Sequence, residues 1–377
     1  MFSEAEKNRR LSAVSGLMEK EGLSAIYLPG NSSVGTHPFG SQRYFTDNRV
    51  IFFIRSVVLL RDSRAVAVVS DLMGKLNLIQ SSFINDAVIN EDQVRGVIEI
   101  LRANGVESGR VGTIYEILPA AWLLKLRDEF PDLEFVDVSD LLLTIRSAKS
   151  AEEVESQRVC ARIAEAGYRA ICETVKPGMY ENEVVAEMER AMQRMGAEES
   201  FALITSGKFS IKDNKLPPLH NFSAINRKIE AGDVVAVEIT PRYNGYWTQI
   251  VRTVCVGEKN EDAEAIRQVI VGSVNAGKEL LKAKTPICEI VRKMREYAED
   301  AGYNFVMPCG HLAGIDLDEG DMTEDITKPL EPGMLVILHP TIITDDMDTS
   351  IFWGESYIVT EKGFEKPMLN GDALYVS

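Results

Sequence analysis

The sequence predicts an α+β protein of two domains, a smaller α/β layer domain over residues 1–145 and a larger domain over residues 146–377. Three observations carry this prediction. Strand-like and helix-like segments alternate up to Leu143. A capping-box pattern formed by Ser150 and Glu153 then opens a new amphipathic helix. Beyond it, one helix–helix–strand pattern occurs twice, over about 151–255 and about 262–360.

The first domain begins with an amphipathic helix over residues 3–22. Ser3 and Glu6 form its capping box, and Gly22 ends it. Four apolar, β-branched segments predict strands: SAIYLPG, Val50–Leu60, AVAVVSD and RVGTIY. Two segments with helical periodicity predict helices: Gln93–Asn104 and Ala120–Phe130.

The repeated pattern of the second domain places two polar side chains in equivalent positions. Each half has a helix after a proline-containing start, KPGMYENE or KTPICEI, and then a glycine turn followed by an apolar strand. In the first half Glu238 lies six residues after Gly232, and in the second half His339 lies six residues after Gly333. A pseudo-twofold axis relating the halves would therefore bring Glu238 and His339 to a common centre.

Composition narrows the class of protein. Of 377 residues 45% are hydrophobic, which is enough to build real cores, while 57 acidic against 41 basic residues give a net charge of −16. This charge repels nucleic acid phosphates and anionic lipids, and favours small neutral or cationic partners. The sequence shows no signal-peptide pattern and no apolar run long enough to span a membrane. Five cysteines without CxxC spacing favour reduced thiols, and we expect a cytoplasmic protein.

The second domain resembles the creatinase, prolidase and aminopeptidase P family of pita-bread proteins. The resemblance begins at LLLTIRSAKSAEEVESQRVCARIAEAGYRAICETVKPGMYENEV and continues through LHNFSAINRKIEAGDVVAVEITPRYNGYWTQIVRT, GHLAGIDLDEG, EPGMLVILHP and GESYIVTEKG. It covers residues 140–370 in order, and the N-terminal α/β part is similar to the family's smaller domain. The resemblance implies a pita-bread fold behind a creatinase-type N-terminal domain, and a homodimer.

The resemblance also implies a site, because the family's peptidases hold two divalent metals with two Asp, one His and two Glu. Here the first Asp corresponds to Glu238, the second to Gln249 and the His to His311, whereas the first Glu corresponds to His339. The last acidic position falls at or beside Glu355. Two hard cations that share a water need several anionic oxygens, so we expect that the two-metal site is not intact.

Two interpretations of this site stay open. His311, His339 and Glu355, with Gln249 and Glu238 beside them, would suit one divalent ion such as zinc, iron or manganese. Alternatively, no metal binds, and the cavity works through hydrogen bonds and a histidine base, as in creatinase. The resemblance makes His220 that catalytic histidine, since an imidazole with a pKa near ~6.5 exchanges protons at neutral pH.

Three further residues are candidates for substrate binding: Glu238, Arg252 and Asp318. Arg252 corresponds to an arginine that braces the metal-ligand hairpin in the family, so a structural ion pair is its alternative role. Asp318 stands where the aminopeptidases have a second histidine, within an acidic run that could equally be a solvated loop. Arg43 and Arg49 lie where the family's N-terminal domain reaches toward a neighbouring subunit.

The leading hypothesis is an atypical hydrolase that cleaves an amide, amidine or peptide C–N bond of a small molecule or dipeptide. A second hypothesis is a pseudo-peptidase that binds a peptide or small ligand without turnover. A third is an Xaa-Pro peptidase with substituted ligands. The substrate, and whether a metal binds, stay open at this point.

Overall fold

The computed structural model describes residues 2–30, 40–49, 54–212, 219, 225–344, 351–369, 371 and 373–377. Its contacts divide the chain into two compact units. Unit 1 comprises residues 1–152 together with 315–317, and unit 2 comprises residues 153–314 and 318–377. The short segment 315–317 is held in unit 1 by Asp316, which accepts a hydrogen bond from the backbone N–H of Gly40 and forms a buried ion pair with Arg146.

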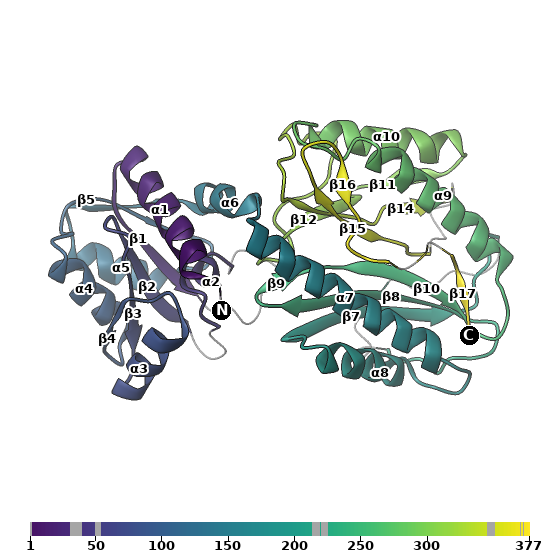
Figure 1. The fold of residues 1–377 in the computed structure, drawn as a ribbon, viewed down its shortest axis with the longest axis horizontal. Coiled ribbons are helices and arrows are strands. Elements are labelled where there is room, and N and C mark those ends of the chain that lie inside the picture. The colour runs from purple at the N-terminus through teal and green to yellow at the C-terminus, as the bar shows by residue number, and fades with distance from the viewer. Residues whose placement is uncertain are drawn as a thin grey trace. The chain divides into compact units, whose positions relative to one another are not determined.

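Unit 1 is a layered α/β structure (Figure 1). Within its described residues a six-stranded sheet has the order β4-β3-β2-β1-β5-β6, in which β1–β5, β5–β6 and β3–β4 are parallel pairs. Its strands are β1 (Leu23–Gly30), β2 (Arg55–Leu60), β3 (Ala65–Val69), β4 (Asp86–Ile89), β5 (Gly109–Thr113) and β6 (Leu133–Asp137). Its helices are α1 (Glu4–Lys20), α2 (Gly40–Thr46), α3 (Leu72–Ser81), α4 (Gln93–Ala103), α5 (Ala120–Glu129) and α6 (Ser139–Ser147).

Local chemistry explains why these elements form. The hydroxyl of Ser3 caps α1 by accepting a hydrogen bond from the backbone N–H of Glu6 at 3.2 Å, and the chain leaves that helix at Gly22 with φ +67°. On the sheet, α4 buries Val97 and Leu101 against strand residues such as Val58. The predicted strands and helices of this part are confirmed where they are described; residues 50–53 lie outside the described residues.

Unit 2 contains the helices α7 (Ala151–Thr174), α8 (Glu181–Arg194), α9 (Glu261–Lys278) and α10 (Ile287–Asp300). Its strands are β7 (Glu199–Gly207), β8 (Val234–Tyr243), β9 (Tyr246–Trp247), β10 (Ile250–Cys255), β11 (Asn304–Val306), β12 (Gly310–Ala313), β13 (Leu335–Leu338), β14 (Thr341–Ile343), β15 (Glu355–Val359), β16 (Phe364–Glu365) and β17 (Tyr375–Val376). Within the described part, one sheet has the order β17-β10-β8-β7 with β9 on β8, a second has the order β12-β13-β15-β16, and β11 pairs with β14.

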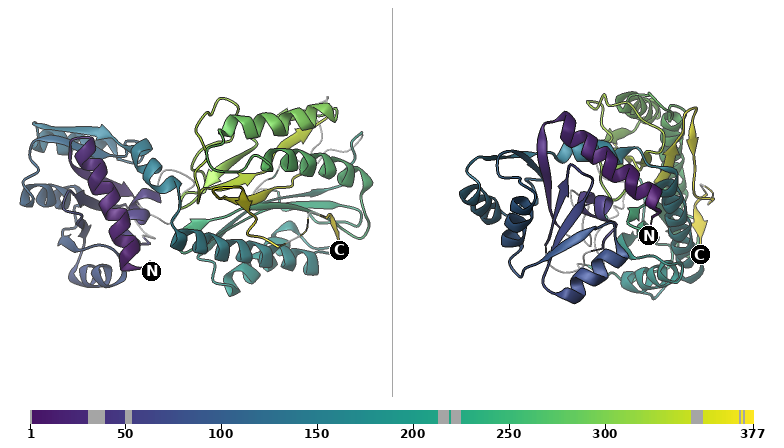
Figure 2. Two further views of the ribbon diagram at one scale, coloured as in Figure 1. Left: turned by 45° about the horizontal axis from the view of Figure 1, so that its top comes forward. Right: turned by 60° about the vertical axis from the view of Figure 1, so that its left-hand side comes forward.

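The predicted duplication of this unit is confirmed. Helices α7 and α8 pack on β7, β8 and β10 around Ile204 and Val237, and helices α9 and α10 pack on β13 and β15 around Met294 and Val336. In the left view of Figure 2 the helix pairs lie on the outside of the strands of this unit. The turn glycines preceding β8 and β13, Gly232 and Gly333, have φ of +79° and +88°.

The two sheets of unit 2 meet edge to edge near the start of β15. Val251 of β10 and Gly354 exchange backbone hydrogen bonds of 3.2 and 3.0 Å. The hydroxyl of Ser356 donates to the carbonyl oxygen of Gln249 at 2.6 Å, and the N–H of Trp247 donates to the carbonyl of Gly314 at 2.8 Å. These bonds place the residues before β10 beside β12 and β15, so chain segments far apart in sequence share one region.

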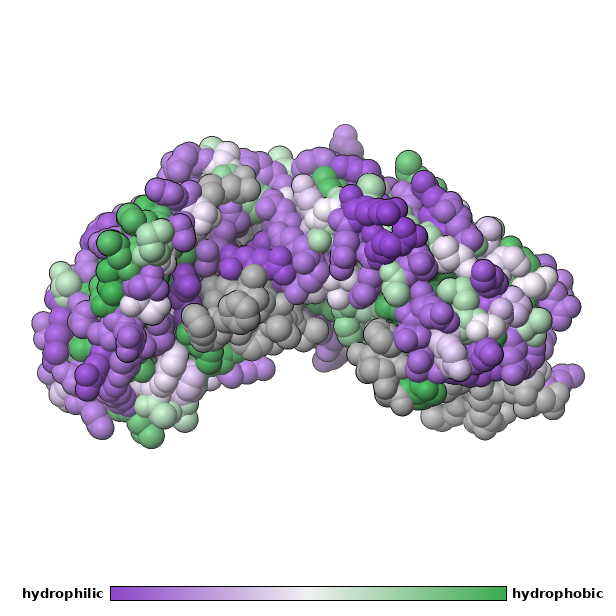
Figure 3. Space-filling view, turned by 90° about the horizontal axis from the view of Figure 1, so that it is seen from below, coloured by the Kyte–Doolittle hydropathy of each residue, from purple (hydrophilic) through white to green (hydrophobic). Residues whose placement is uncertain are grey.

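The surface and the thiols agree with the composition. Hydrophilic residues cover most of the face seen in Figure 3, and apolar residues form small separate patches on it. All five cysteines are buried, and none forms a disulfide. In the part of the chain that the structure describes, no helix is both long enough and apolar enough to span a bilayer.

Candidate functional site

Glu238 and Gln249 come from the first half of unit 2 and share one face of its sheet. Glu238 pairs with Val251 in the β8–β10 ladder, and Gln249 precedes Val251 by two residues. Because side chains alternate along a strand, Gln249 lies on the same face as Glu238. The Gln249 amide forms a side-chain hydrogen bond with the Glu238 carboxyl.

His311 and His339 come from the second half. His311 pairs with Ile337 in the β12–β13 ladder, and His339 follows Ile337 by two residues, so both imidazoles face the same way. The ring centroids are 5.2 Å apart with an interplanar angle of 66°, an edge-to-face arrangement. The backbone N–H of His339 donates to the carbonyl oxygen of Cys309 at 2.9 Å, which fixes the position of this residue beyond the end of β13.

One side-chain hydrogen bond joins the two halves. Nε2 of His311 lies 3.0 Å from Oε1 of Gln249, and Nδ1 of His311 lies 3.2 Å from the carbonyl oxygen of Leu312. Since an amide oxygen accepts, Nε2 of His311 donates, and the amide NH₂ of Gln249 is left for Glu238. Glu238, Gln249 and His311 therefore form a hydrogen-bonded chain, and His339 packs against its end. We refer to these four residues as the polar chain.

Burial controls the protonation of the polar chain. It raises the pKa of Glu238 to about 7, although the hydrogen bond from Gln249 opposes this shift. Burial, together with the neighbouring charge of His311, lowers the pKa of His339 to about 3. His339 is therefore a neutral imidazole at physiological pH. Its Nε2 is buried and has no hydrogen-bond partner among the described residues.

Glu355 does not join the polar chain in the structure. Its carboxylate is fully buried, and its Oε2 lies 2.7 Å from Nη2 of Arg252 and 3.0 Å from Nζ of Lys366. In the β13–β15 ladder Ser356 pairs with Ile337, so Ser356 shares the face of His311 and Glu355 points to the opposite face.

The neighbour of Glu355 on the face of the polar chain is Gly354. A Cβ placed on Gly354 would lie 2.5 Å from the Cβ of His339, so the His339 side chain occupies the space that a residue-354 side chain would need. Sequence matching left this position ambiguous by one residue. The sequence GESYIV carries no alternation that decides it, because Tyr357, Ile358 and Val359 are consecutive apolar residues. The pairing of Ser356 with Ile337 places Gly354, two residues earlier, on the site face.

Arg252 and Asp318 also lie apart from the polar chain. Arg252 pairs with Val237, on the face of the sheet opposite Glu238. Its guanidinium lies 5.0 Å from the ring centroid of Trp353 and 5.8 Å from that of Tyr168, a bracing arrangement inside the core. Asp318 is half-buried, and its Oδ1 accepts from the backbone N–H of Gly320 at 2.9 Å within its own turn.

The predicted catalytic histidine, His220, lies outside the described residues. Arg43 is buried in α2, and Arg49 is exposed just after it. Among the described residues, no group of three or more His, Cys, Asp and Glu side chains is arranged to hold a metal ion. The structure thus brings together Glu238, Gln249, His311 and His339.

Comparison with known proteins identifies the family. Residues 155–361 match the model of metallopeptidase family M24, and residues 10–148 match the creatinase/prolidase N-terminal domain. A creatinase of Bacillus sp. (strain B-0618) is 26% identical over 91% of this chain and 84% of its own length. An Xaa-Pro dipeptidase of Pyrococcus furiosus is 27% identical over 62% of this chain and 66% of its own length.

A solved structure shares the whole architecture. The Xaa-Pro dipeptidase from Bacillus anthracis superposes with a TM-score of 0.83 over 98% of this chain and all of that chain, at 22% sequence identity. This likeness confirms the predicted pita-bread fold preceded by a creatinase-type N-terminal domain. With the family model covering more than half of the sequence, the chain belongs to metallopeptidase family M24.

Proposed function

We propose that this chain is a metal-independent hydrolase that cleaves a C–N bond in a small zwitterionic or cationic molecule. Its polar wall is the chain formed by Glu238, Gln249, His311 and His339. The observation that carries the proposal is the 3.0 Å contact between Gln249 Oε1 and His311 Nε2. Positions that correspond to metal ligands in the family are joined here to one another by hydrogen bonds.

The donor set does not fit the family's pair of divalent cations. The polar chain offers one carboxyl, one amide and two imidazoles, so its negative charge is at most −1 against about four positive charges. Gln249 gives its oxygen to His311 and its NH₂ to Glu238. Glu355, the other predicted ligand, is neutralised by Arg252 and Lys366. The proposed reaction therefore uses no metal ion.

The substrate class follows from Glu238. A carboxyl whose pKa lies about 7 is readily ionised when a cationic group approaches it, because the added positive charge stabilises the carboxylate. A guanidinium, amidinium or ammonium group would therefore gain an ion pair at this end of the polar chain. At the other end, Nε2 of His339 is buried without a partner among the described residues, so a donor group of the substrate that displaced its cover would satisfy it.

The proposal assigns proton transfer to His220. This imidazole takes a proton from water as the water oxygen bonds to the substrate carbon, and it returns the proton to the nitrogen as the C–N bond breaks. We also propose, from the resemblance to the family and the cysteine usage, that the protein forms a homodimer and acts in the cytoplasm. Light scattering coupled to size exclusion, and subcellular fractionation, test these two expectations.

A panel of dipeptides, guanidino acids and cyclic amides tests the proposed reaction, with product release followed by chromatography. We expect turnover in the presence of chelator, loss of at least a hundredfold for His220→Ala, a typical general-base contribution, and losses for His311→Ala and His339→Ala. Gln193→Ala, an exposed amide on α8, is the matched control and should retain activity. Turnover that is unchanged in all three histidine variants would contradict the proposal.

A pseudo-peptidase that binds without turnover is the second candidate. The sequestered carboxylate of Glu355 favours it, since a possible ligand or acid is held by two cations on the other side of the sheet. This candidate predicts that the same panel gives a ligand-induced rise in melting temperature without product. An Xaa-Pro peptidase with substituted ligands would instead require manganese or cobalt for release of a residue before proline.

A further inference from the structure

Unit 1 contains a cavity of about 500 Å³ that the proposed function does not use. It lies where the parallel strands β3 and β4 end, because its lining includes Val69 at the end of β3 and Glu91 just beyond β4. Helix α3, which follows β3, supplies Gly74 (Figure 1). In open α/β sheets, the carboxyl ends of the strands are the usual place for small ligands.

Arg55 brings an unpaired positive charge to this cavity. Its guanidinium forms no ion pair and no hydrogen bond with any residue that the structure describes, although the residue is half-buried. Burial alone lowers the pKa of Arg55, with no carboxylate to offset it. A partly desolvated guanidinium without a partner is costly, and an anionic ligand would remove that cost.

Glu91 brings an unpaired negative charge to the same cavity. Its carboxylate is exposed and makes no ion pair with any residue that the structure describes, Arg55 included. The other acidic residue of the lining, Asp71, is engaged as the N-cap of α3. Its oxygens accept from the N–H of Gly74 at 2.8 Å and the hydroxyl of Ser70 at 3.0 Å.

Ile54, Val68 and Val69 are the apolar residues of the lining. A polyanion such as phosphate would find one cation but two carboxylates here, which disfavours it. A molecule with a negative group, a separate positive group and an apolar substituent matches Arg55, Glu91 and the apolar residues of the lining. The cavity volume is sufficient for a molecule of amino acid or dipeptide size.

We infer that this cavity is a binding site for a zwitterionic amino acid or dipeptide with an apolar side chain. Arg55 receives the carboxylate through two parallel hydrogen bonds, Glu91 attracts the ammonium group, and the apolar side chain lies against Val69 and Ile54. The inference is independent of the proposed hydrolase, since it uses only residues of unit 1.

Titration calorimetry of the full chain tests this site with L-leucine, leucinamide, 4-methylpentanoate and inorganic phosphate as probes. We expect saturable binding of L-leucine, and affinities at least tenfold lower for leucinamide, which lacks the carboxylate, and for 4-methylpentanoate, which lacks the ammonium group. Arg55→Gln should weaken L-leucine binding at least tenfold without changing the melting temperature. Arg64→Gln, which removes an exposed arginine paired with Asp62, is the matched control and should bind normally.

A second variant blocks the cavity without changing its charge. A Cβ on Gly74 makes only ordinary contacts of 3.6 Å or more, so the backbone accepts a side chain here, and we expect that of Gly74→Leu to occupy the space. It should abolish L-leucine binding while the fold is retained. The inference is overturned if L-leucine does not bind, if it binds equally to Arg55→Gln or Gly74→Leu, or if phosphate binds more tightly than L-leucine.

Discussion

Gln249 is the residue on which the polar chain depends. A glutamine amide has both an acceptor oxygen and a donor NH₂, so it can accept from His311 and donate to Glu238 at the same time. An ionised aspartate or glutamate at this position has acceptors only and would oppose the Glu238 carboxylate. The amide that weakens a metal site therefore suits a hydrogen-bonded site.

Replacing Gln249 by alanine should destabilise the protein. The change leaves the partly buried Glu238 carboxyl and Nε2 of His311 without their partners, which should lower the free energy of unfolding by up to about 1–3 kcal/mol for each unsatisfied group. Urea unfolding measures the loss. Gln193→Ala, the exposed amide control, should stay within about 0.5 kcal/mol of the parent, and equal stabilities for the two variants would contradict the observed chain.

Glu238 should make stability fall as the pH rises. The pKa of its carboxyl is about 7 in the folded protein and 4.5 when unperturbed, so the unfolded chain releases its proton first. The contribution is fully present below pH 4.5 and is lost as the pH rises through about 7. Unfolding experiments from pH 4.5 to 8 should show this loss in the parent, and Glu238→Gln should remove it. An identical pH dependence of both proteins would count against a buried Glu238.

His339 should act in the opposite direction. The pKa of its imidazole is about 3 in the folded protein against 6.5 unperturbed, because burial and His311 disfavour the charged form. Its contribution to stability is present above pH 6.5 and is lost as the pH falls through about 3. His339→Gln should reduce the acid sensitivity of the melting temperature between pH 6.5 and 4. If this variant is as acid-sensitive as the parent, His339 is not buried in its neutral form.

At the scale of elements, strands β12, β13 and β15 position the imidazoles. Their alternation decides which residue faces the site, and it separates Glu355 from His311. Sequence matching placed the last acidic position at or beside Glu355. A shift of one residue is small along the sequence, but in a strand it moves the side chain to the other face of the sheet. The strand β8 had no such ambiguity, and Glu238 lies where the repeated pattern put it.

Gly310 at the start of β12 should be intolerant of substitution. Its φ is +151°, and a Cβ there would overlap the carbonyl oxygen of Ile337 in the neighbouring strand. A strained backbone alone lowers the free energy of unfolding by about 1–3 kcal/mol. We expect Gly310→Ala to lower it by more, because the added methyl group also separates β12 from β13. Gly302 also has a positive φ, but a Cβ there would meet no neighbouring atom. Gly302→Ala should therefore lower the free energy of unfolding by about 1–2 kcal/mol. Thermal unfolding of the two variants distinguishes the two effects.

The ion pair between Glu355 and Arg252 should be structural. Replacing Glu355 by alanine leaves the buried guanidinium without its carboxylate, which costs about 3–5 kcal/mol. Glu365→Gln changes a carboxylate of similar chemistry on β16, but its pair with Arg158 is partly exposed and should contribute about 1 kcal/mol or less. Chemical denaturation of Glu355→Ala and Glu365→Gln compares their free energies of unfolding. A small effect at Glu355 would show that Arg252 is satisfied without it.

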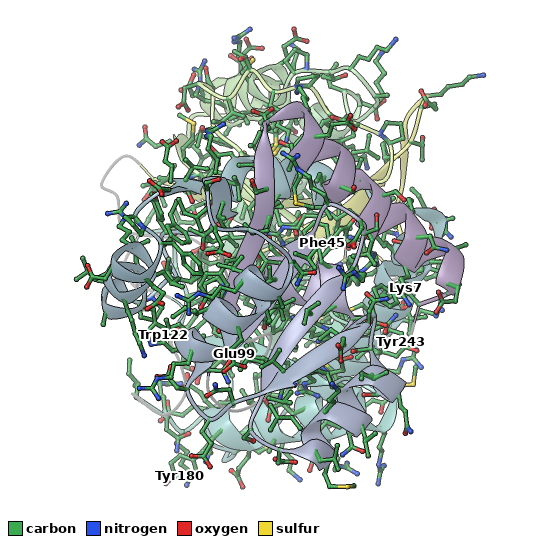
Figure 4. All side chains as sticks on the ribbon, turned by 90° about the vertical axis from the view of Figure 1, so that its left-hand side faces the viewer. Lys7, Phe45, Glu99, Trp122, Tyr180 and Tyr243 are labelled. Atoms are coloured by element: carbon green, nitrogen blue, oxygen red, sulfur yellow. The ribbon has the colours of Figure 1, made fainter. Side chains whose placement is uncertain are left out.

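At the scale of the whole molecule, much of the architecture was predictable from the sequence. The duplicated halves, their glycine turns and the alternating first part are properties of local pattern. Figure 1 shows the helices and strands of both halves, and Figure 4 shows Trp122 of α5 and Tyr180 at the start of α8. The hydrogen bond from His311 to Gln249 spans 62 positions and depends on how two sheets meet. No local pattern encodes such a contact, so its partners could be named but their bonding could not.

The proposed function requires that Glu238, Gln249 and His311 bond to one another instead of holding two cations. Metal analysis of the full chain tests it most directly, after purification without chelator or histidine tag, incubation with excess zinc, manganese or ferrous iron, and desalting. We expect the protein to retain no metal and to have the same melting temperature with and without these ions. Retention of one or two ions per chain, abolished by His311→Ala, would contradict it.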